Sequence, residues 1–188
     1  DRETIDACPS IKYITILATG YNVVDIKSAR EKGIPVSNIP SYGTDSVAQY
    51  AIALLLELCH HIGHHDREVK NGRWENSIDW CFWDYPLVEL SGKTMGILGF
   101  GRIGKRTAEI AKALGMNVIV SRRKDEEYTD DKGWKHVSKE DLFKLSDVIS
   151  LHAPETEETK RIINSETISM MKDGVLLVNS SRGGLIDE

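Results

Sequence analysis

A glycine-rich stretch at residues 99–104 (GFGRIG) constrains the fold of this chain more than any other feature. It follows an apolar run at residues 94–98 that has the length of a buried strand, and it opens a helical pattern at residues 102–114. A further apolar run at residues 117–120 stands where a β-α-β unit needs its next strand. The order strand, glycine loop, helix and strand is typical of a dinucleotide-binding fold.

Each glycine of this loop has a separate expected task. Gly99 makes the tight turn, Gly101 lets the backbone approach a pyrophosphate, and Gly104 lets the helix pack against the strand. Arg102 and Ile103 open the helix, whose first N–H groups and partial positive charge favour a bound phosphate. The alternative is a glycine-rich turn without a ligand.

The end of the following strand indicates the type of cofactor. A site for NAD usually carries Asp or Glu there, bonded to the ribose 2′-hydroxyl. This sequence has Ser121, Arg122 and Arg123 instead. Arg side chains bind phosphate with two parallel hydrogen bonds, so the sequence favours NADP(H) over NAD(H). The alternative is that both arginines point into solvent.

Short apolar runs alternate with helical patterns along the chain, which predicts an α/β fold with a doubly wound parallel sheet. Gly115 and Gly33 follow predicted helices as caps, and Ser138 should open another helix. A mixed-charge stretch at residues 122–135 is expected to be a solvated loop. Further strands are predicted at 11–18, 35–39, 148–151 and 175–179, and helices at 25–32, 44–71 and 165–172.

Composition excludes several classes of protein. The 188 residues carry a net charge of −5 and are 40% hydrophobic, which is ordinary for a globular protein and unfavourable for nucleic-acid binding. No apolar stretch reaches the roughly 20 residues of a membrane span. The chain does not open with a signal peptide, and Cys8, Cys59 and Cys81 fit no metal spacing, so we expect a cytoplasmic protein with reduced thiols.

Four histidines, at positions 60, 61, 64 and 65, have i, i+4 spacing on the predicted helix 44–71. Such spacing can bind a metal ion. No carboxylate completes a convincing ligand set, so we expect a solvated helix surface and no metal.

Five motifs occur in a fixed order: residues 18–25 (ATGYNVVD), 36–40 (VSNIP), 92–104 (GKTMGILGFGRIG), 146–154 (SDVISLHAP) and 179–188 (NSSRGGLIDE). With them the chain resembles the D-isomer-specific 2-hydroxyacid dehydrogenase family over essentially its whole length. It looks most like the glycerate dehydrogenase (hydroxypyruvate reductase) branch.

The resemblance implies two domains. Residues 1–44 would be part of a smaller, flavodoxin-like substrate domain, and residues 45–188 an incomplete Rossmann domain opened by the linking helix. It further implies transfer of a hydride between a nicotinamide cofactor and a small 2-keto or 2-hydroxy acid.

The family's arginine motif aligns with Arg182, which would contact the substrate carboxylate and the reacting oxygen; a structural ion pair is the alternative. The family's substrate loop aligns with residues whose backbone N–H groups would face the substrate carboxylate, unless they form a plain turn: Thr19, Gly20, Tyr21 and Asn22. By the same resemblance the cofactor side is lined by His152, Ala153, Pro154, Thr159, Asn179, Ser180 and Ser181.

The family's catalytic glutamate and histidine follow the arginine motif, beyond residue 188. We therefore expect a chain truncated at both ends that binds cofactor but turns over poorly. The resemblance also implies a homodimer through the apolar face of helix 44–71 and the segment after it, although apolar surface left by the missing ends could cause self-association as well. A second function is an NAD(P)-binding, corepressor-like regulatory module without catalysis, with the aromatic segment 74–85 and the long helix 44–71 as its partner surface.

Overall fold

The structure is a computed structural model that describes residues 1–122 and 127–188. Its chain divides into two compact units, residues 1–44 and 45–188, which are described separately below. No helix in these described ranges is long and apolar enough to cross a membrane. All three cysteines lie within them and are free thiols.

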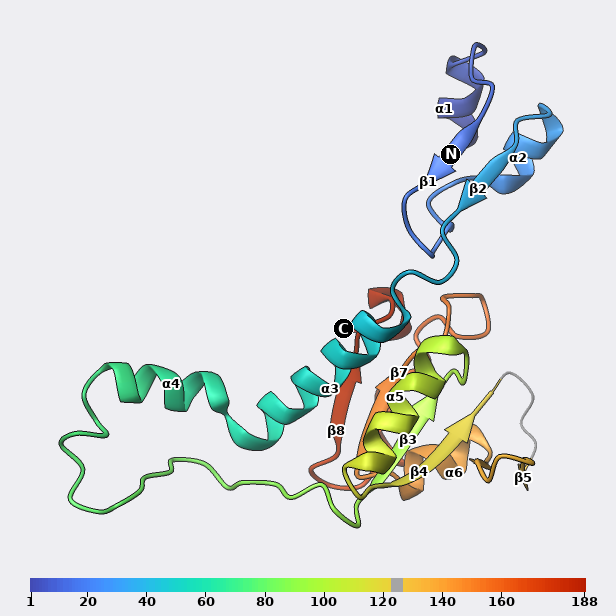
Figure 1. Cartoon of the computed structure of the whole chain (residues 1–188). Coiled ribbons are helices and arrows are strands. Elements are labelled where there is room, and N and C mark those ends of the chain that lie inside the picture. Colours follow the sequence, from blue (N-terminus) through green and yellow to red (C-terminus); the bar gives the residue numbers. More distant parts are fainter. Residues whose placement is uncertain (123–126) are drawn as a thin grey trace. The chain divides into compact units, whose positions relative to one another are not determined.

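The first unit pairs two short parallel strands with two short helices (Figure 1). Strand β1 (Ile14–Ile16) pairs with β2 (Val36–Asn38), so that Ile14 lies opposite Val36. Helices α1 (Arg2–Ala7) and α2 (Ile26–Glu31) contribute to a small core. That core contains the buried Ile5, Ala29 and Ile34. The sequence did not predict α1, which is only 6 residues long and has one buried residue to mark its inner face.

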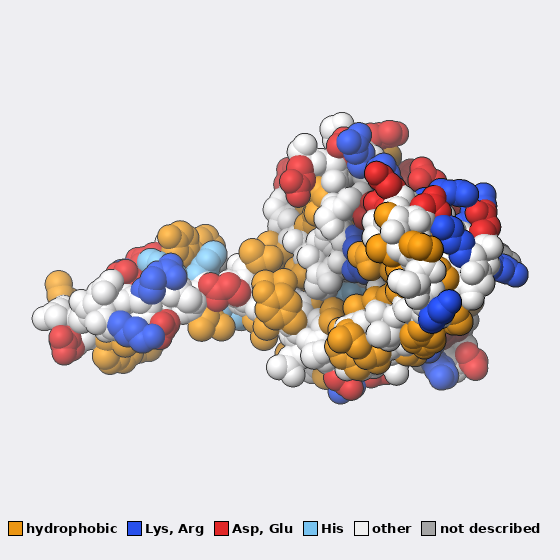
Figure 2. Space-filling model, turned by 90° about the horizontal axis from the view of Figure 1, so that it is seen from above, with side chains coloured by type: hydrophobic (Ala, Val, Ile, Leu, Met, Phe, Trp, Pro, Cys, Tyr) orange, Lys and Arg blue, Asp and Glu red, His pale blue; other side chains and the backbone are white. Residues whose placement is uncertain are grey.

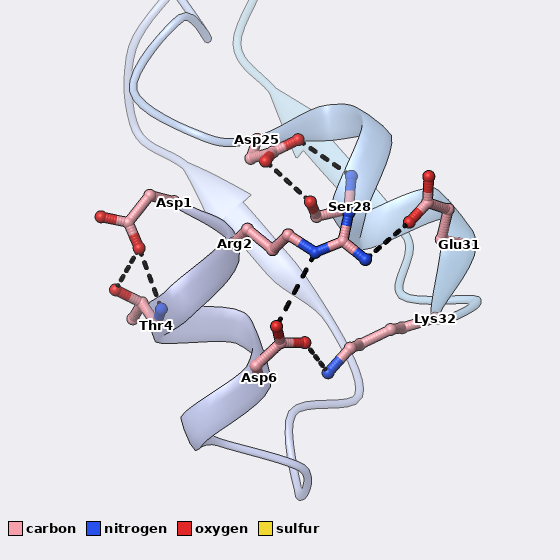
Figure 3. A network of polar contacts seen from close by, with 8 residues as sticks. All are labelled: Asp1, Arg2, Thr4, Asp6, Asp25, Ser28, Glu31 and Lys32. Atoms are coloured by element: carbon pink, nitrogen blue, oxygen red, sulfur yellow. Dashed lines mark hydrogen bonds and ion pairs between the residues drawn. The ribbon is translucent and has the colours of Figure 1, made fainter.

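Polar contacts supplement this small core (Figure 3). Asp25 caps α2 by accepting a 2.9 Å hydrogen bond from the Ser28 N–H. Arg2 of α1 forms an ion pair with Glu31 of α2 at 3.4 Å, and Lys32 forms another with Asp6. The two helices of the unit are thus joined by charge pairs at the surface, each worth little alone.

The second unit is built on a six-stranded sheet in the order β5-β6-β4-β3-β7-β8. All neighbouring strands are parallel except β5 and β6. Its strands are β3 (Thr94–Leu98), β4 (Asn117–Ser121), β5 (Tyr128–Thr129), β6 (Lys135–His136), β7 (Val148–Leu151) and β8 (Leu176–Asn179). The predicted central strands are therefore confirmed.

Helices cover both faces of this sheet, because the central strands are buried on both sides. Side chains of α3 (Thr44–His60) and α5 (Arg102–Ala113) pack against one face, around Ile97 and Val120. Side chains of α6 (Lys139–Leu145) pack against the other, around Ile119. The remaining elements are α4 (Ile62–Lys70), α7 (Ser165–Ser169) and the 3-10 turn η1 (Gly183–Leu185).

The prediction of one helix over residues 44–71 is wrong. Helix α3 ends at His60, and His61 has a left-handed backbone (φ 50°) before α4 begins. The carboxylate of Glu57 accepts a hydrogen bond from the Gly63 N–H at 3.1 Å, and so satisfies a free donor at the start of α4. The left-handed residue between the two helices is thus a histidine, and Gly63 follows it as the second residue of α4.

The prediction of a solvated loop over residues 122–135 is wrong in part, because its described residues are mostly exposed, as expected, but some of them form strands. Residues 128–129 form β5, and Lys135 belongs to β6, which extends the sheet beyond β4. Trp134 packs edge-on to Phe100, with the ring centroids 5.5 Å apart. The strands have two residues each, which is too short for an alternating pattern to be visible in the sequence.

Candidate cofactor site

A pocket of about 780 Å³ opens at the carboxyl ends of strands β3, β4 and β7. This edge is where parallel α/β sheets bind their ligands. Its wall includes several residues that the sequence assigned to a cofactor: Gly99, Gly101, Ser121, Arg122, His152, Ala153, Pro154 and Thr159.

The glycine loop lies at the centre of the pocket wall and has the backbone that its residues require. Gly99 has φ +95°, and a Cβ atom there would lie 2.6 Å from the carbonyl carbon of His152. At Gly104 a Cβ atom would overlap the carbonyl oxygen of Gly99. At Gly101 a Cβ atom would meet nothing within 4 Å, so this side of the loop is open to a ligand.

Ser121 and Arg122 lie at the end of β4 and line the same pocket. The Ser121 side chain is 2% exposed, and its hydroxyl has no hydrogen-bond partner among the described residues. Such an orphaned buried hydroxyl is rare, and because Ser121 lines the pocket, a polar group of a ligand could complete it. The Arg122 guanidinium lies 5.3 Å from the centre of the Phe100 ring, within the range of a cation–π contact. Arg123 lies outside the described residues.

His152 follows β7 and is largely enclosed by the pocket wall. A 2.9 Å hydrogen bond joins its Nε2 to the Ser150 hydroxyl, which is buried. Burial lowers the pKa of His152 from its ordinary 6.5 to about 4. At neutral pH this imidazole is therefore uncharged, and it contributes shape and hydrogen bonding to the pocket but no positive charge.

Thr159 shapes the pocket wall through the backbone. Its hydroxyl donates to the Pro154 carbonyl oxygen at 2.6 Å and accepts from the Thr156 N–H at 2.8 Å. The hydroxyl is thus occupied within its own loop. The sequence assigned Thr159 to cofactor contact, whereas its bonds in the structure are those of a residue that fixes the loop after β7.

Asn179, at the end of β8, shapes the loop that follows this strand. Its side chain accepts a hydrogen bond from the Ser181 N–H at 3.0 Å and donates to the Arg182 carbonyl oxygen at 2.8 Å. The Ser181 hydroxyl donates to the Ala153 carbonyl oxygen at 2.7 Å, which joins this loop to the one after β7. The Ser180 hydroxyl is buried without a partner in the described ranges.

Arg182 follows directly and is half-buried at the start of η1. Its guanidinium donates to the Ser181 carbonyl oxygen at 3.1 Å. This loop therefore carries the arginine that the sequence assigned to the substrate, next to residues that it assigned to the cofactor.

The four other predicted substrate residues belong to the first unit, in the turn that follows β1. The Thr19 hydroxyl donates to the Ile39 carbonyl oxygen at 3.0 Å, and its carbonyl oxygen accepts from the Asn38 side chain at 2.8 Å. The Val24 N–H closes the turn onto the Tyr21 carbonyl oxygen, while the Tyr21 side chain is 57% exposed. Gly20 and Asn22 complete this turn.

The histidines around α4 are not a plain solvated surface, which corrects that expectation. His64 Nε2 lies 2.5 Å from a carboxylate oxygen of Asp84, and the His61 ring packs against Tyr85 at 4.5 Å. The His65 ring stacks on Phe82 at 5.6 Å. Across the described residues, no three His, Cys, Asp or Glu side chains come together as a metal site.

The sequence missed Lys139, Glu157 and Glu158, which also line the pocket. Lys139 is the first residue of α6, directly after the cap residue Ser138 that the sequence did identify. No signal for this was available in the sequence, because α6 starts at the carboxyl edge of the sheet only through the pairing of the two-residue strand β6 with β4.

These features fit a dinucleotide. The loop is open at Gly101, the helix α5 begins beside it, and the Ser121 hydroxyl and the Arg122 guanidinium lie at the end of β4. Helix N-termini and arginine side chains both favour phosphate groups. The arrangement defines the class of protein as one with a dinucleotide-binding α/β fold.

Comparison with known proteins agrees with this class and narrows it. Residues 52–188 match the sequence model of the D-isomer specific 2-hydroxyacid dehydrogenase, NAD binding domain. The chain therefore belongs to the D-isomer-specific 2-hydroxyacid dehydrogenase family. A hydroxypyruvate reductase of Blautia hydrogenotrophica is 55% identical over 187 residues, covering all of this chain and 58% of that protein.

Solved structures show the same relationship. A D-lactate dehydrogenase from Aquifex aeolicus, complexed with NAD and lactic acid, is 36% identical with a TM-score of 0.86. An acyclic imino acid reductase in complex with NADPH and D-Arg is 34% identical with a TM-score of 0.85. The match covers all of this chain but only 55% and 58% of those chains. The chain thus spans a little over half the length of its relatives.

Proposed function

We propose that this chain supplies the cofactor-binding part of an oxidoreductase that transfers a hydride between NADP(H) and a small 2-keto or 2-hydroxy acid. The acid would be of the glycerate or hydroxypyruvate type, as the name of the Blautia relative suggests. In this proposal residues 45–188 are a doubly wound Rossmann domain, and residues 1–44 are part of a flavodoxin-like substrate domain. Catalysis would depend on the whole protein.

The observation that carries the cofactor assignment is the end of β4. An unpaired buried hydroxyl and a guanidinium stand there, at Ser121 and Arg122, and β4 itself contains no acidic residue. A carboxylate would accept a bond from a 2′-hydroxyl, whereas a guanidinium and a hydroxyl suit a 2′-phosphate. The guanidinium over the Phe100 ring favours this role over a side chain that points freely into solvent.

When bound, the nicotinamide cofactor supplies the hydride. The chain's own residues would bind and orient. The Gly101 backbone and the first turn of α5 would hold the pyrophosphate, while His152 and Pro154 would cover the dinucleotide. Arg182 would hold the substrate carboxylate and stabilise negative charge on the reacting oxygen. In the first unit, residues 19–22 would offer backbone N–H groups to a carboxylate.

Two further parts of the proposal come from the family and from composition. A homodimer agrees with the apolar side chains exposed after α3, among them Trp74, Ile78, Trp80 and Trp83. Figure 2 shows such side chains gathered on the part of the second unit that α4 and the following segment form. A cytoplasmic location stays a prediction.

The experiment is an assay of the protein that carries this chain, with hydroxypyruvate, glyoxylate and pyruvate as substrates and with NADPH or NADH. Hydroxypyruvate with NADPH should give the highest kcat/KM. Arg122→Ala should raise KM for NADPH about tenfold and leave KM for NADH nearly unchanged, because only the 2′-phosphate is lost as a partner. Arg182→Lys should lower kcat/KM for the acid with either cofactor by about a hundredfold.

The two variants separate the two halves of the proposal. Equal loss of both cofactors in Arg122→Ala would refute the 2′-phosphate assignment. Unchanged turnover in Arg182→Lys would refute the substrate role of that arginine. Cofactor binding by a whole protein that reduces none of these acids would favour the regulatory module.

A further inference from the structure

Lys139 stands in the wall of the cofactor pocket although it belongs to no recognised motif. It is the first residue of α6, after the cap residue Ser138, and it is half-buried. It lines the same pocket as Ser121 and Arg122, although it belongs to a different element of the fold. Val137, two residues earlier, donates its N–H to the Val120 carbonyl oxygen at 3.0 Å, so α6 begins with Lys139 close to the end of β4.

The helix itself does not account for a lysine at this position. The start of a helix carries partial positive charge, so cations are favoured at its other end. Glu140 and Asp141 follow that rule in the first turn, and Lys144 follows it in the last turn, where it pairs with Glu140. Lys139 is placed against the rule, and a local conflict of this kind is expected where a residue serves a ligand.

The charge balance of the pocket gives the lysine a specific task. Its described wall holds two cations, Arg122 and Lys139, and two carboxylates, Glu157 and Glu158. His152 adds no charge at neutral pH because burial lowers its pKa to about 4. Among these described residues Lys139 makes the number of cations equal to that of carboxylates, which reduces the repulsion of a phosphate that carries about two negative charges.

We propose that Lys139 is a specificity-determining residue that binds the 2′-phosphate of NADP(H) together with Arg122 and the Ser121 hydroxyl. This inference rests on the proposed preference for NADP(H). Arg122 would provide a fixed planar contact over Phe100, and Lys139 a compact charge on a flexible stem. The unpaired Ser121 hydroxyl, 2% exposed, is the independent sign that a polar ligand group belongs between them.

The test is a binding titration of the 188-residue chain with NADPH and with NADH, followed by nicotinamide fluorescence. Lys139→Ala should raise the Kd for NADPH about tenfold and change the Kd for NADH less than about twofold. Lys139→Arg should keep most of the NADPH affinity, since it keeps the charge. Added salt should narrow the gap between wild type and Lys139→Ala, because the contact is ionic.

Lys144→Ala is the matched control, since Lys144 lies on the same helix but not in the pocket wall. It should alter neither affinity. Competition titrations with 2′,5′-ADP and with AMP should show the same difference. Lys139→Ala should weaken the binding of 2′,5′-ADP, which has a 2′-phosphate, and leave the binding of AMP unchanged. The thermal midpoint of each variant shows whether the fold is kept.

Failure of this inference and failure of the NADP(H) preference give different results. If Arg122→Ala weakens NADPH selectively and Lys139→Ala does not, the preference stands and the role of Lys139 is overturned. If the wild type binds NADPH no more tightly than NADH and neither variant acts selectively, both the preference and the role of Lys139 are overturned.

Discussion

The cofactor pocket and the segment from α4 to Leu87 belong to the same unit but are held together by different kinds of contact. At the pocket, main-chain atoms approach so closely that Gly99 has no room for a side chain. In the α4 segment, α4 buries no residue, and Asp84 joins Arg73 to His64 through side chains alone. The first region depends on what the backbone can adopt, and the second on which side chains meet.

The difference predicts how each region responds to substitution. A substitution at a position where the backbone leaves no room for a side chain should lower the stability of the whole unit, because the closely packed main chain around it cannot move aside without a large energetic cost. A substitution that removes an exposed side-chain contact should destabilise only the segment around it. Three changes test this contrast, from the largest expected effect to the smallest.

Gly99→Ala should have the largest effect. The residue has φ +95°, and the new Cβ atom would lie 2.6 Å from the carbonyl carbon of His152. Positive φ and overpacking are both unfavourable, so we expect the free energy of unfolding to fall by about 3 kcal/mol or more. Urea unfolding followed by circular dichroism measures this loss.

Gly101→Ala is the matched control in the same loop. Gly101 has φ −83°, which alanine adopts without strain, and its Cβ atom would meet nothing within 4 Å. The fold should keep its stability to within about 1 kcal/mol. Cofactor affinity should still fall, because the methyl group would occupy the open side of the loop. Equal stability of the two variants would show that the backbone at Gly99 is not constrained as described.

The next largest effect is expected from the titration of His152. It should make the free energy of unfolding depend on pH. The pKa of His152 is about 4 in the folded chain, against an ordinary 6.5. Between these values the unfolded chain binds a proton that the folded chain excludes. Stability should therefore fall as the pH drops from about 6.5 toward 4, with this histidine contributing on the order of 1–3 kcal/mol.

His152→Gln removes the titrating group and keeps a polar atom for Ser150. Denaturant unfolding of the wild type and of His152→Gln at several pH values isolates the contribution of His152 to the pH dependence of stability, since all other titratable groups are present in both proteins. The curve of the variant should be flatter in this window, and cofactor affinity of the wild type should show no step near pH 6.5. Parallel curves for the two proteins would mean that water reaches the imidazole.

The same contrast explains what the sequence could predict. The glycine loop and the central strands were predicted because backbone geometry imposes a residue type at a fixed spacing, as at Gly99 and Gly104. Buried strands also need continuous apolar runs, as in β3 and β7. Each of these rules concerns a single residue or a single helix or strand, so its effect can be recognised in one sequence.

Features that depend on particular side-chain contacts or on strand pairing were missed. The break at His61 depends on the Glu57 carboxylate, and β6 is recognisable only once it pairs with β4. Lys139 reaches the pocket because α6 begins at one edge of the sheet. Thr159 lines the pocket, but the hydrogen bonds of its hydroxyl within its own loop could not be predicted from residue types.

Asp84→Asn should have the smallest and most local effect. Asp84 accepts hydrogen bonds from Arg73, one of them at 2.7 Å, and lies 2.5 Å from His64. These partners hold the pKa of the Asp84 carboxyl well below its ordinary 3.8. Because the folded-state pKa is lowered, the contribution of this carboxylate is complete above the ordinary value and is lost as the pH falls below it.

Amide hydrogen exchange read by mass spectrometry localises the effect. In Asp84→Asn, residues 62–87 should exchange faster at neutral pH, while β3 and β7 keep the protection of the wild type. Asp79→Asn is the matched control, since Asp79 is an exposed carboxylate of the same segment. Lost protection in β3 would mean that the segment supports the sheet, and would break the contrast between the two regions. Unchanged exchange throughout would instead place the stability of the segment in its aromatic contacts, such as His65 on Phe82, rather than in the charge network around Asp84.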